Sequence, residues 1–419
     1  MLHGGSVVAK QELHRPSEAE AAALLSELVA IESVNPALPG GGSGEAGVAA
    51  YVEQYCRDLG LEVVRQDVLP GRQNVIVRLG VPHAARTLVL EAHMDTMVLS
   101  PMSRQEALHP AVREGRLYGR GACDTKGSLA AMLLALRALV PLRDTLPCEV
   151  LLLGSVDEEV TFEGVRTFAR TGVGRLGFAT PVPPLGGAVV GEPTLLQPII
   201  AHKGIVRFRL QAHGRAAHTS TPERGENAIY TMLALIDGLR HELEPVLARR
   251  THPLLSPPTL TVSRIWGGVA VNVVPDSCTV EIDRRLNPGE RVEDALREID
   301  EALARVAARH QPPLRYTRHE PFVIDYALET SPDAAVVRAA LEACTEVLQQ
   351  PVEPRGVPYG TDASKLWAIG GVPSIVLGPG DIAQAHAAGE YVELHQVVLA
   401  TEIYARIALR LQDGARSSA

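Results

Sequence analysis

The sequence lacks three features that would mark other classes of protein. Its five cysteines are scattered, odd in number and without a CxxC pair, which indicates reduced thiols in a cytoplasm. The first residues, MLHGGSVVAK, contain no apolar core of a signal peptide, and no run of about 18 apolar residues occurs, so neither secretion nor a membrane span is indicated. Aromatic residues make up only 4%, and no basic stripe interleaves with them, so nucleic-acid binding is not indicated.

What the sequence does contain is typical of a soluble globular protein. Hydrophobic residues make up 46% and charged residues 21%, which is the range of folded globular proteins. A chain of 419 residues exceeds one compact core of ordinary size, so we expect two domains. The formal charge of -9 is modest for this length and favours a small-molecule partner.

Apolar runs alternate with helical patterns over most of the chain. The runs, which we expect to be buried strands, span 74–80, 87–95, 149–159, 186–194 and 372–380. Helices are expected over 17–33, 45–60, 125–140 and 332–349. Ser17 and Glu20 form a capping-box pattern, and Ser331 with Pro332 predicts the start of the last helix. This alternation predicts an α/β sheet covered by helices on both faces.

Residues 200–320 have a different pattern. Half-buried strand patterns and two helical stretches follow one another in the order β-α-β-β-α-β, which is the ferredoxin-like arrangement. We therefore predict an inserted α+β domain over 200–320, within a main domain formed by 1–199 and 321–419.

Acidic and imidazole side chains collect where the predicted strands end. Five segments carry them: His93 with Asp95, then Asp124, then the run from Asp157 to Glu159, then Glu192, and last His386. In open α/β sheets, ligands bind beyond the carboxyl ends of the strands. Two imidazoles and at least three carboxylates suit zinc or a related first-row metal.

Each segment taken singly has a plainer explanation. His93 with Asp95 could be a surface pair, although a carboxylate often orients a ligating imidazole. Asp124 could merely cap the helix that follows it. The three consecutive acids ending at Glu159 could form a solvated turn, or could be held together by cations.

Seven ordered segments together resemble a known family of metallohydrolases. EAHMDT, GRGACDTKG, SVDEE, GEPT and GPGDIAQAH resemble motifs of the family that includes acetylornithine deacetylase, succinyl-diaminopimelate desuccinylase, aminoacylase and glutamate carboxypeptidase. The segments 214–229 and 267–285 resemble its lid motifs. The resemblance implies a zinc-exopeptidase-like, three-layer α/β/α catalytic domain with two metals and an inserted ferredoxin-like lid that often forms a dimer interface.

The resemblance also implies roles for individual residues. One metal would be held by His93 and Glu192, the other by Glu159 and His386, with Asp124 bridging both. Glu158 would be the general base and Asp95 would orient His93. The metals are expected to be two Zn²⁺ ions, with Co²⁺ or Mn²⁺ as alternatives. Such ions lower the pKa of bound water from about 15.7 toward roughly 7.

For the lid, the resemblance implies substrate contacts. His218 would stabilise the developing oxyanion, often across a dimer interface. The substrate carboxylate would meet Arg285 and Asn272 on the lid and Gly360 and Thr361 on the main domain, since an arginine fork can grip a carboxylate with two bonds. A surface imidazole at His218, and a salt bridge from Arg285 to Glu281 or Asp283, are the plainer alternatives.

The sequence thus predicts a cytoplasmic enzyme that hydrolyses the amide bond of an N-acyl amino acid, in the manner of acetylornithine deacetylase. A dipeptidase or carboxypeptidase acting on short peptides is the second hypothesis. A non-catalytic protein that binds amino-acid derivatives is the third. A homodimer formed through the lid is expected.

Overall fold

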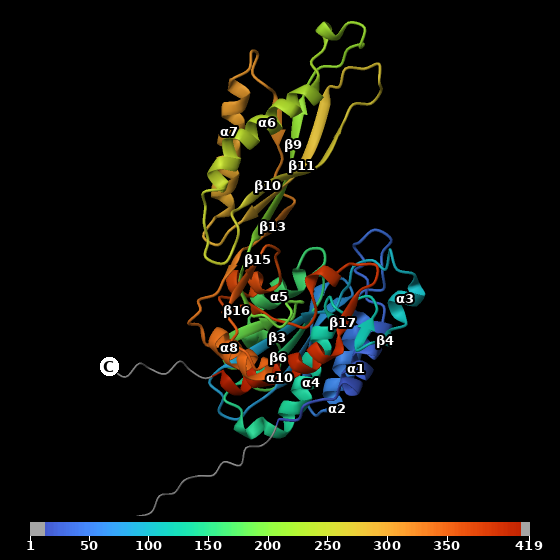
Figure 1. Ribbon diagram of the computed structural model, residues 1–419, viewed down its shortest axis with the longest axis vertical. Helices are drawn as coiled ribbons and strands as arrows, with labels where there is room; N and C mark the ends of the chain where they lie inside the picture. The colour runs from blue at the N-terminus through green and yellow to red at the C-terminus, as the bar shows by residue number, and fades with distance from the viewer. Residues whose placement is uncertain (1–12, 412–419) are drawn as a thin grey trace, which may run out of the picture. The chain divides into compact units, whose positions relative to one another are not determined.

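The computed structural model describes residues 13–411, which form two compact units (Figure 1). The first unit comprises the described residues within Met1–Ile200, Thr330–Arg355 and Thr361–Ala419. The second comprises Ala201–Glu329 and Gly356–Gly360, so it is an insertion into the first. The lid and dimerisation role expected for residues 200–320 stays a prediction.

The first unit is built on a mixed sheet whose central strands are buried on both faces. The sheet has the order β1-β2-β6-β3-β7-β16-β8-β14, with β15 paired to β8; β14 and the last residues of β8 and β15 are counted with the second unit. The strands are β1 Glu62–Leu69, β2 Arg72–Leu79, β3 Thr87–His93, β6 Glu149–Ser155, β7 Leu185–Val190, β8 Ile199–His202, β14 Leu328–Glu329, β15 Arg355–Val357 and β16 Ser374–Val376. β3 runs parallel to β6 and β7, and every residue of β3 and β6 is buried, as expected of a sheet covered by helices on both sides.

Helices supply the covering layers. They are α1 Glu18–Ala30, α2 Ala46–Asp58, α3 Arg104–Leu108, α4 Lys126–Leu139, α5 Glu163–Thr171, α8 Ala335–Leu348, α9 Ala363–Ala368 and α10 Leu394–Arg410. α4 packs against α1, α10 and β3, while α5 packs against α9. The predicted capping box at Ser17 and Glu20 is confirmed as the start of α1.

One predicted helix start is wrong. α8 begins at Ala335 instead of Pro332, because Ser331 forms a turn before the helix. The hydroxyl of Ser331 accepts the N–H of Asp333 at 3.2 Å, and its carbonyl accepts the N–H of Ala334 at 2.9 Å. A serine that satisfies these backbone groups in a turn is the local alternative to a helix cap.

A small second sheet of the first unit joins distant parts of the chain. Its order is β17-β5-β4, with β4 Ala111–Arg113, β5 Arg116–Tyr118 and β17 Tyr391–Glu393. β17 pairs antiparallel to β5, with Tyr391 opposite Tyr118. The segments that follow β5 and precede β17 are thereby brought together.

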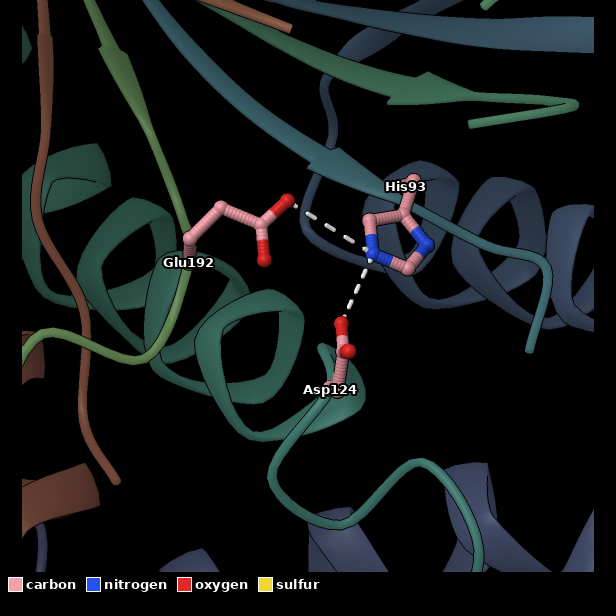
Figure 2. Close-up of side chains that lie close together, drawn as sticks. All are labelled: His93, Asp124 and Glu192. Atoms are coloured by element: carbon pink, nitrogen blue, oxygen red, sulfur yellow. Dashed lines mark hydrogen bonds and ion pairs between the residues drawn. The ribbon is translucent and has the colours of Figure 1, made fainter. Parts of the chain in front are cut away.

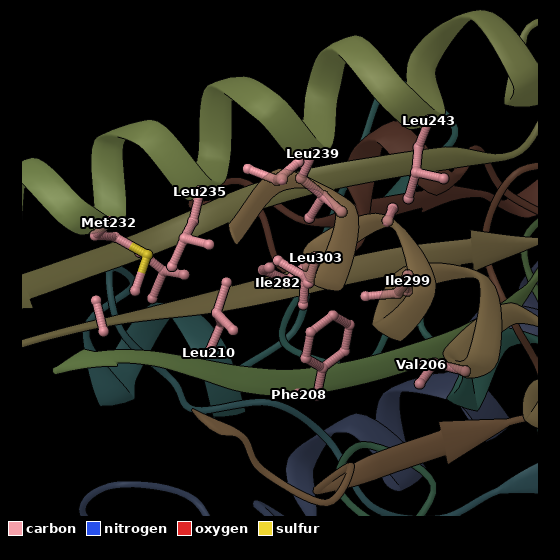
Figure 3. Close-up of a cluster of buried hydrophobic side chains, with 14 of the residues drawn as sticks. Val206, Phe208, Leu210, Met232, Leu235, Leu239, Leu243, Ile282, Ile299 and Leu303 are labelled. Carbon is pink, nitrogen blue, oxygen red and sulfur yellow. The ribbon is translucent and has the colours of Figure 1, made fainter. Parts of the chain in front are cut away.

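The second unit has the predicted ferredoxin-like order. Its elements are β9 Gly204–His213, α6 Ala228–Leu247, β10 Thr259–Gly267, β11 Ser277–Leu286, α7 Val292–Ala308, β12 Tyr316–Arg318 and β13 Val323–Asp325. The antiparallel sheet has the order β10-β11-β9-β12, with β13 also on β9. Alternate residues of β9, among them Phe208 and Leu210, pack under α6 and α7 and form the core drawn in Figure 3.

Within residues 13–411, none of the helices combines the length and the apolar character that crossing a bilayer requires.

Candidate metal centre

The candidate ligands meet at one edge of the first sheet. His93 is the last residue of β3, Glu192 lies two residues beyond β7, and Glu159 follows β6. Because β3, β6 and β7 are parallel neighbours, their carboxyl ends share one edge. Asp124 reaches this edge from the bend before α4, and His386 from the segment that follows β16.

The first cluster consists of His93, Asp124 and Glu192, all buried (Figure 2). The Nε2 atom of His93 lies 3.0 Å from Oδ1 of Asp124 and 3.7 Å from Oε1 of Glu192. Figure 2 shows the three side chains pointing toward one another from three different elements. The arrangement gathers one nitrogen and two oxygen donors around a common point.

The second cluster consists of Asp124, Glu159 and His386. Nε2 of His386 lies 3.2 Å from Oδ2 of Asp124 and 3.3 Å from Oε2 of Glu159. Asp124 thus presents Oδ1 to one imidazole and Oδ2 to the other. A carboxylate in that position has the geometry of a bridging ligand.

Asp124 does not act as a helix cap. The residue at the cap of α4 is Thr125, and no side chain there makes a capping hydrogen bond. The carboxylate of Asp124 is instead directed to the two imidazoles, while its backbone N–H donates to Glu390 at 3.0 Å.

Asp95 holds both the histidine and the acidic segment. The Nδ1–H of His93 donates to the backbone carbonyl of Asp95 at 2.9 Å, and its Nε2 atom faces the carboxylates of Asp124 and Glu192. The Asp95 carboxylate accepts the N–H groups of Glu158 at 3.1 Å and Glu159 at 3.2 Å, and the amide of Asn35 at 2.7 Å. Its carboxylate therefore holds the backbone of the two glutamates, and its Oδ1 atom also lies 3.6 Å from Nδ1 of His93.

The side chains of Asp157, Glu158 and Glu159 have different surroundings. Asp157 pairs with Arg72, whose Nη1 lies 2.9 Å from Oδ1, and Arg72 also pairs with Glu45. Asp157 has a positive φ of 69°, an uncommon backbone conformation for a residue other than glycine. The turn directs Glu159 to His386 and leaves Glu158 half-buried beside the cluster.

The crowding of carboxylates perturbs their pKa values. Burial raises the pKa of Glu192 to about 8, and the charge of Asp124 adds to the effect. Burial also raises the pKa of Glu158 well above its usual range, with contributions from Glu192 and Asp362. Hydrogen bonds to Asp124 and Glu159 raise the pKa of His386 to about 10. Such a site favours added positive charge.

Pairing between Asp124 and the imidazoles shifts the pKa of each partner toward its charged form. Burial alone would raise the pKa of Asp124, but hydrogen bonds from His386 and His93 outweigh it and lower that pKa. Burial likewise opposes the protonated form of His93, yet Asp124 and Asp95 raise its pKa well above the usual value. The donor set, three carboxylates and two imidazoles, matches the ligands that divalent first-row metals take in proteins.

The remaining candidate residues lie elsewhere. His218 and Asn272 are close together in the second unit, where His218 bridges to Val273 and the N–H of Thr219 donates to the carbonyl of Asn272 at 3.1 Å. The His218 ring is exposed and its Nδ1 lies 2.8 Å from the hydroxyl of Ser220. Gly360 belongs to the second unit and Thr361, which is buried, to the first.

Arg285 forms the strand-face salt bridge that was its plainer alternative. Its Nε donates to Oδ1 of Asp283 at 2.7 Å, and its Nη1 lies 3.5 Å from the carbonyl of Pro358. The side chain keeps about a quarter of its surface exposed. Asp283 therefore fixes one side of the guanidinium.

Several residues at the centre were not predicted from the sequence. Asn35 joins the carboxylates of Asp95 and Asp157, at 2.7 and 3.0 Å. Ser155 donates to Glu91 at 2.6 Å, and its hydroxyl lies 3.3 Å from Asp362. No spacing marks these residues, although Glu91 is an acid within an apolar run that becomes a fully buried strand.

The fold and the clustered donors together define the class of metal-dependent hydrolases with two adjoining ligand sets. The chain belongs to Peptidase family M20/M25/M40, which its residues 89–410 match. It is 32% identical to the acetylornithine deacetylase of Myxococcus xanthus over 397 residues, covering 92% of this chain and 95% of the relative. The acetylornithine deacetylase of Klebsiella pneumoniae is 33% identical over 360 residues, covering 84% and 88%.

Solved structures show the same fold. A tripeptidase from Staphylococcus aureus superposes with a TM-score of 0.77 at 20% identity, covering 95% of this chain and 99% of the other. Human carnosine dipeptidase 1 superposes with a TM-score of 0.69 at 17% identity, and the match covers 95% of this chain and 99% of the other. A dinuclear metal binding peptidase from Bacillus subtilis superposes with a TM-score of 0.70 at 15% identity, and the match covers 94% of this chain and 98% of the other. The predicted family and fold class are confirmed, and the chain is a metal-dependent hydrolase of amide bonds.

Proposed function

We propose that the chain removes the acyl group from an N-acyl amino acid, with acetylornithine or a close analogue as substrate. The observation that carries the proposal is the pair of ligand sets sharing Asp124, in a chain about one-third identical to acetylornithine deacetylases along nearly its whole length. Two divalent ions, most simply Zn²⁺, would be held by His93 and Glu192 on one side and by Glu159 and His386 on the other. When bound, they would polarise the scissile carbonyl and acidify water.

In this proposal Glu158 is the general base. Its carboxylate belongs to neither ligand set, yet it is attached next to Glu159 and its backbone is held by Asp95. A carboxylate outside both ligand sets can take a proton from water and return it to the departing amine. Proton transfer of this kind contributes about 10²- to 10⁴-fold to the rate.

The substrate carboxylate is assigned to Arg285, Asn272, Gly360 and Thr361, and the developing oxyanion to His218. The surroundings of Arg285 support its assignment. Asp283 holds the Nε atom, whereas Nη1 has a long contact of 3.5 Å to the carbonyl of Pro358. The assignment requires that residues of the second unit reach substrate bound at the metals. Scattering curves that show no change on adding a substrate analogue, together with unchanged KM in Arg285→Ala, would remove these roles.

A homodimer through the second unit is part of the proposal. β10 forms an edge of its sheet, and Trp266, Val269 and Val271 on and after it are exposed, Val271 to 99%. Tyr230 and Leu233 add exposed apolar surface on α6. An open strand edge beside apolar side chains is a surface that a second copy would cover. The five free, buried cysteines support a cytoplasmic location.

The test is a substrate panel with the zinc-loaded protein: N-acetylornithine, N-succinyl-diaminopimelate, simple N-acetyl amino acids, dipeptides and tripeptides. The proposal expects the highest kcat/KM for an N-acyl amino acid. A peptide as the best substrate would assign the chain to the peptidases of its family instead. Glu158→Ala and Glu158→Gln should both keep two metals and lose at least about 100-fold in kcat. Unchanged turnover would exclude Glu158 as the base.

A further inference from the structure

The two ligand sets differ in how the fold supports them. His93 and Glu192 are attached to β3 and β7, which are buried strands of the main sheet, and the His93 side chain is 2% exposed. His386 lies between β16 and β17, outside any strand, with a side chain that is 50% exposed and a φ of +62°. Its position relative to Asp124 must therefore be fixed by contacts of its own segment.

Glu390, four residues after His386, makes those contacts. It is fully buried, and its Oε1 atom accepts the N–H groups of Cys123 and Asp124, both at 3.0 Å. Its backbone carbonyl accepts the N–H of Gly119 at 3.1 Å. Glu390 therefore accepts three hydrogen bonds from the segment that carries Asp124.

Arg120 keeps Glu390 in place. Its Nη1 donates to Oε2 of Glu390 at 2.6 Å, and both side chains are at most 2% exposed. Among residues 13–411, the buried Nε and Nη2 of Arg120 have no hydrogen-bond partner, so its charge is directed to Glu390. A charged acceptor forms stronger bonds to backbone N–H groups than a neutral one.

Further contacts join the same two segments on either side. At one end β17 pairs with β5, where Val392 lies opposite Leu117. At the other end the thiol of Cys123 donates to the carbonyl of Asp381 at 3.3 Å. Residues 381–393 therefore contact residues 116–124 at both ends. Glu390 makes the contact to Asp124 itself.

We propose that Glu390, held by Arg120, is a positioning residue that sets Asp124 against His386 and thereby controls the affinity for one of two metal ions, the one assigned to Glu159 and His386. The inference rests on the metal centre of the proposed function. Asp124 belongs to both ligand sets, but His93 ends the buried strand β3 whereas His386 lies outside any strand, so loss of Glu390 weakens the ion assigned to Glu159 and His386 more than the other ion. Loss of such outer contacts costs about 10- to 100-fold in metal affinity.

The experiment compares two double variants. Arg120→Met with Glu390→Ala removes the buried pair without leaving an unpaired charge and deletes the acceptor of both N–H groups. Arg120→Met with Glu390→Gln keeps one oxygen that can accept them. Glu393→Gln is the matched control, since Glu393 is three residues after Glu390, at the end of β17, and pairs with Arg116 at 2.8 Å.

Stepwise titration of each metal-free protein with Co²⁺, followed by calorimetry and by the visible spectrum, gives the two affinities separately. We expect the alanine variant to bind one ion at least about 10-fold more weakly than the wild type, and to lose clearly less affinity for the other ion. The glutamine variant should recover part of this loss, and Glu393→Gln should show none. Far-UV circular dichroism verifies folding, and the glutamine variant decides if the alanine variant does not fold.

Two outcomes are contrary to the inference: wild-type affinities for both ions in the double variants, or equal weakening of both ions. A wild-type protein that binds no divalent ion would instead refute the proposed metal centre. The two failures are therefore distinguishable in one set of titrations.

Discussion

Asp95→Asn is the substitution that best tests how the centre is held. The asparagine has the same shape but only one acceptor oxygen. In the structure, Oδ1 of Asp95 accepts the N–H of Glu158, while Oδ2 accepts the N–H of Glu159 and the amide of Asn35. In Asp95→Asn an NH₂ group replaces one of these oxygens. This group must face either the N–H of Glu158 or the N–H of Glu159 and the amide of Asn35.

The expected magnitude follows from that count. At least one hydrogen bond to a charged acceptor is lost and replaced by a contact between two donors. A bond of this kind contributes about 1.5–3 kcal/mol. Because each 1.4 kcal/mol is about tenfold in rate, kcat should fall roughly 10- to 150-fold if the bond positions Glu158. Since the Asp95 carbonyl still accepts the Nδ1–H of His93 at 2.9 Å, both metals should stay bound.

The assay measures kcat and KM on the best substrate of the panel, together with metal content by elemental analysis. Asp58→Asn is the control, because Asp58 is exposed at the end of α2 and accepts only a surface bond from Gln54 at 2.8 Å. A kcat within threefold of the wild type would show that the Asp95 carboxylate does not position the base. Loss of one ion with the loss of activity would show that it acts through His93 instead.

Three further predictions concern pH, packing and assembly. The pKa of Glu192 is raised from 4.5 to about 8 and that of His386 from 6.5 to about 10, so the folded chain binds more protons than the unfolded chain between about pH 5 and 9. Chelator-treated protein should therefore melt at lower temperature as the pH rises through this range, and a flat or rising profile would contradict the shifts. Leu303→Ala, in the fully buried core of the second unit, should cost about 2–5 kcal/mol in the free energy of unfolding, measured by denaturant titration; a cost below about 1 kcal/mol would be inconsistent with the packing in Figure 3. Val271→Asp should lower the molar mass in light scattering to that of a monomer if the β10 edge forms the dimer, whereas an unchanged dimer would place the interface elsewhere.

The sequence predicted what depends on local patterns. The fold class follows from runs such as 87–95, because an apolar run buried on both faces differs from the half-buried alternation of β9. Candidate ligands could be named because each stands where such a run ends. The start of α8 was predicted wrongly because Ser331 fits either a cap or a turn, and only the backbone geometry decides between them.

What the sequence could not supply are contacts between distant segments. Asn35 reaches Asp95 across 60 positions, and Glu390 reaches Asp124 across 266. Neither residue belongs to a pattern of its own, since an asparagine or glutamate in a loop is ordinary by composition. Their importance arises only once folding brings the segments together. Roles assigned to the ligands and to the second unit stay predictions until the substitutions are made.

The division of the ligands along the chain has a consequence for biosynthesis. His93, Asp124, Glu159 and Glu192 precede the inserted unit, whereas His386 follows it. A ribosome adding about 5–20 residues per second needs roughly 10–40 seconds to pass from residue 192 to residue 386. During that interval the nascent polypeptide carries four of the five candidate ligands and one of the two imidazoles. Under the proposed ligand assignment, the second ion can be captured only after residue 386 has been synthesised.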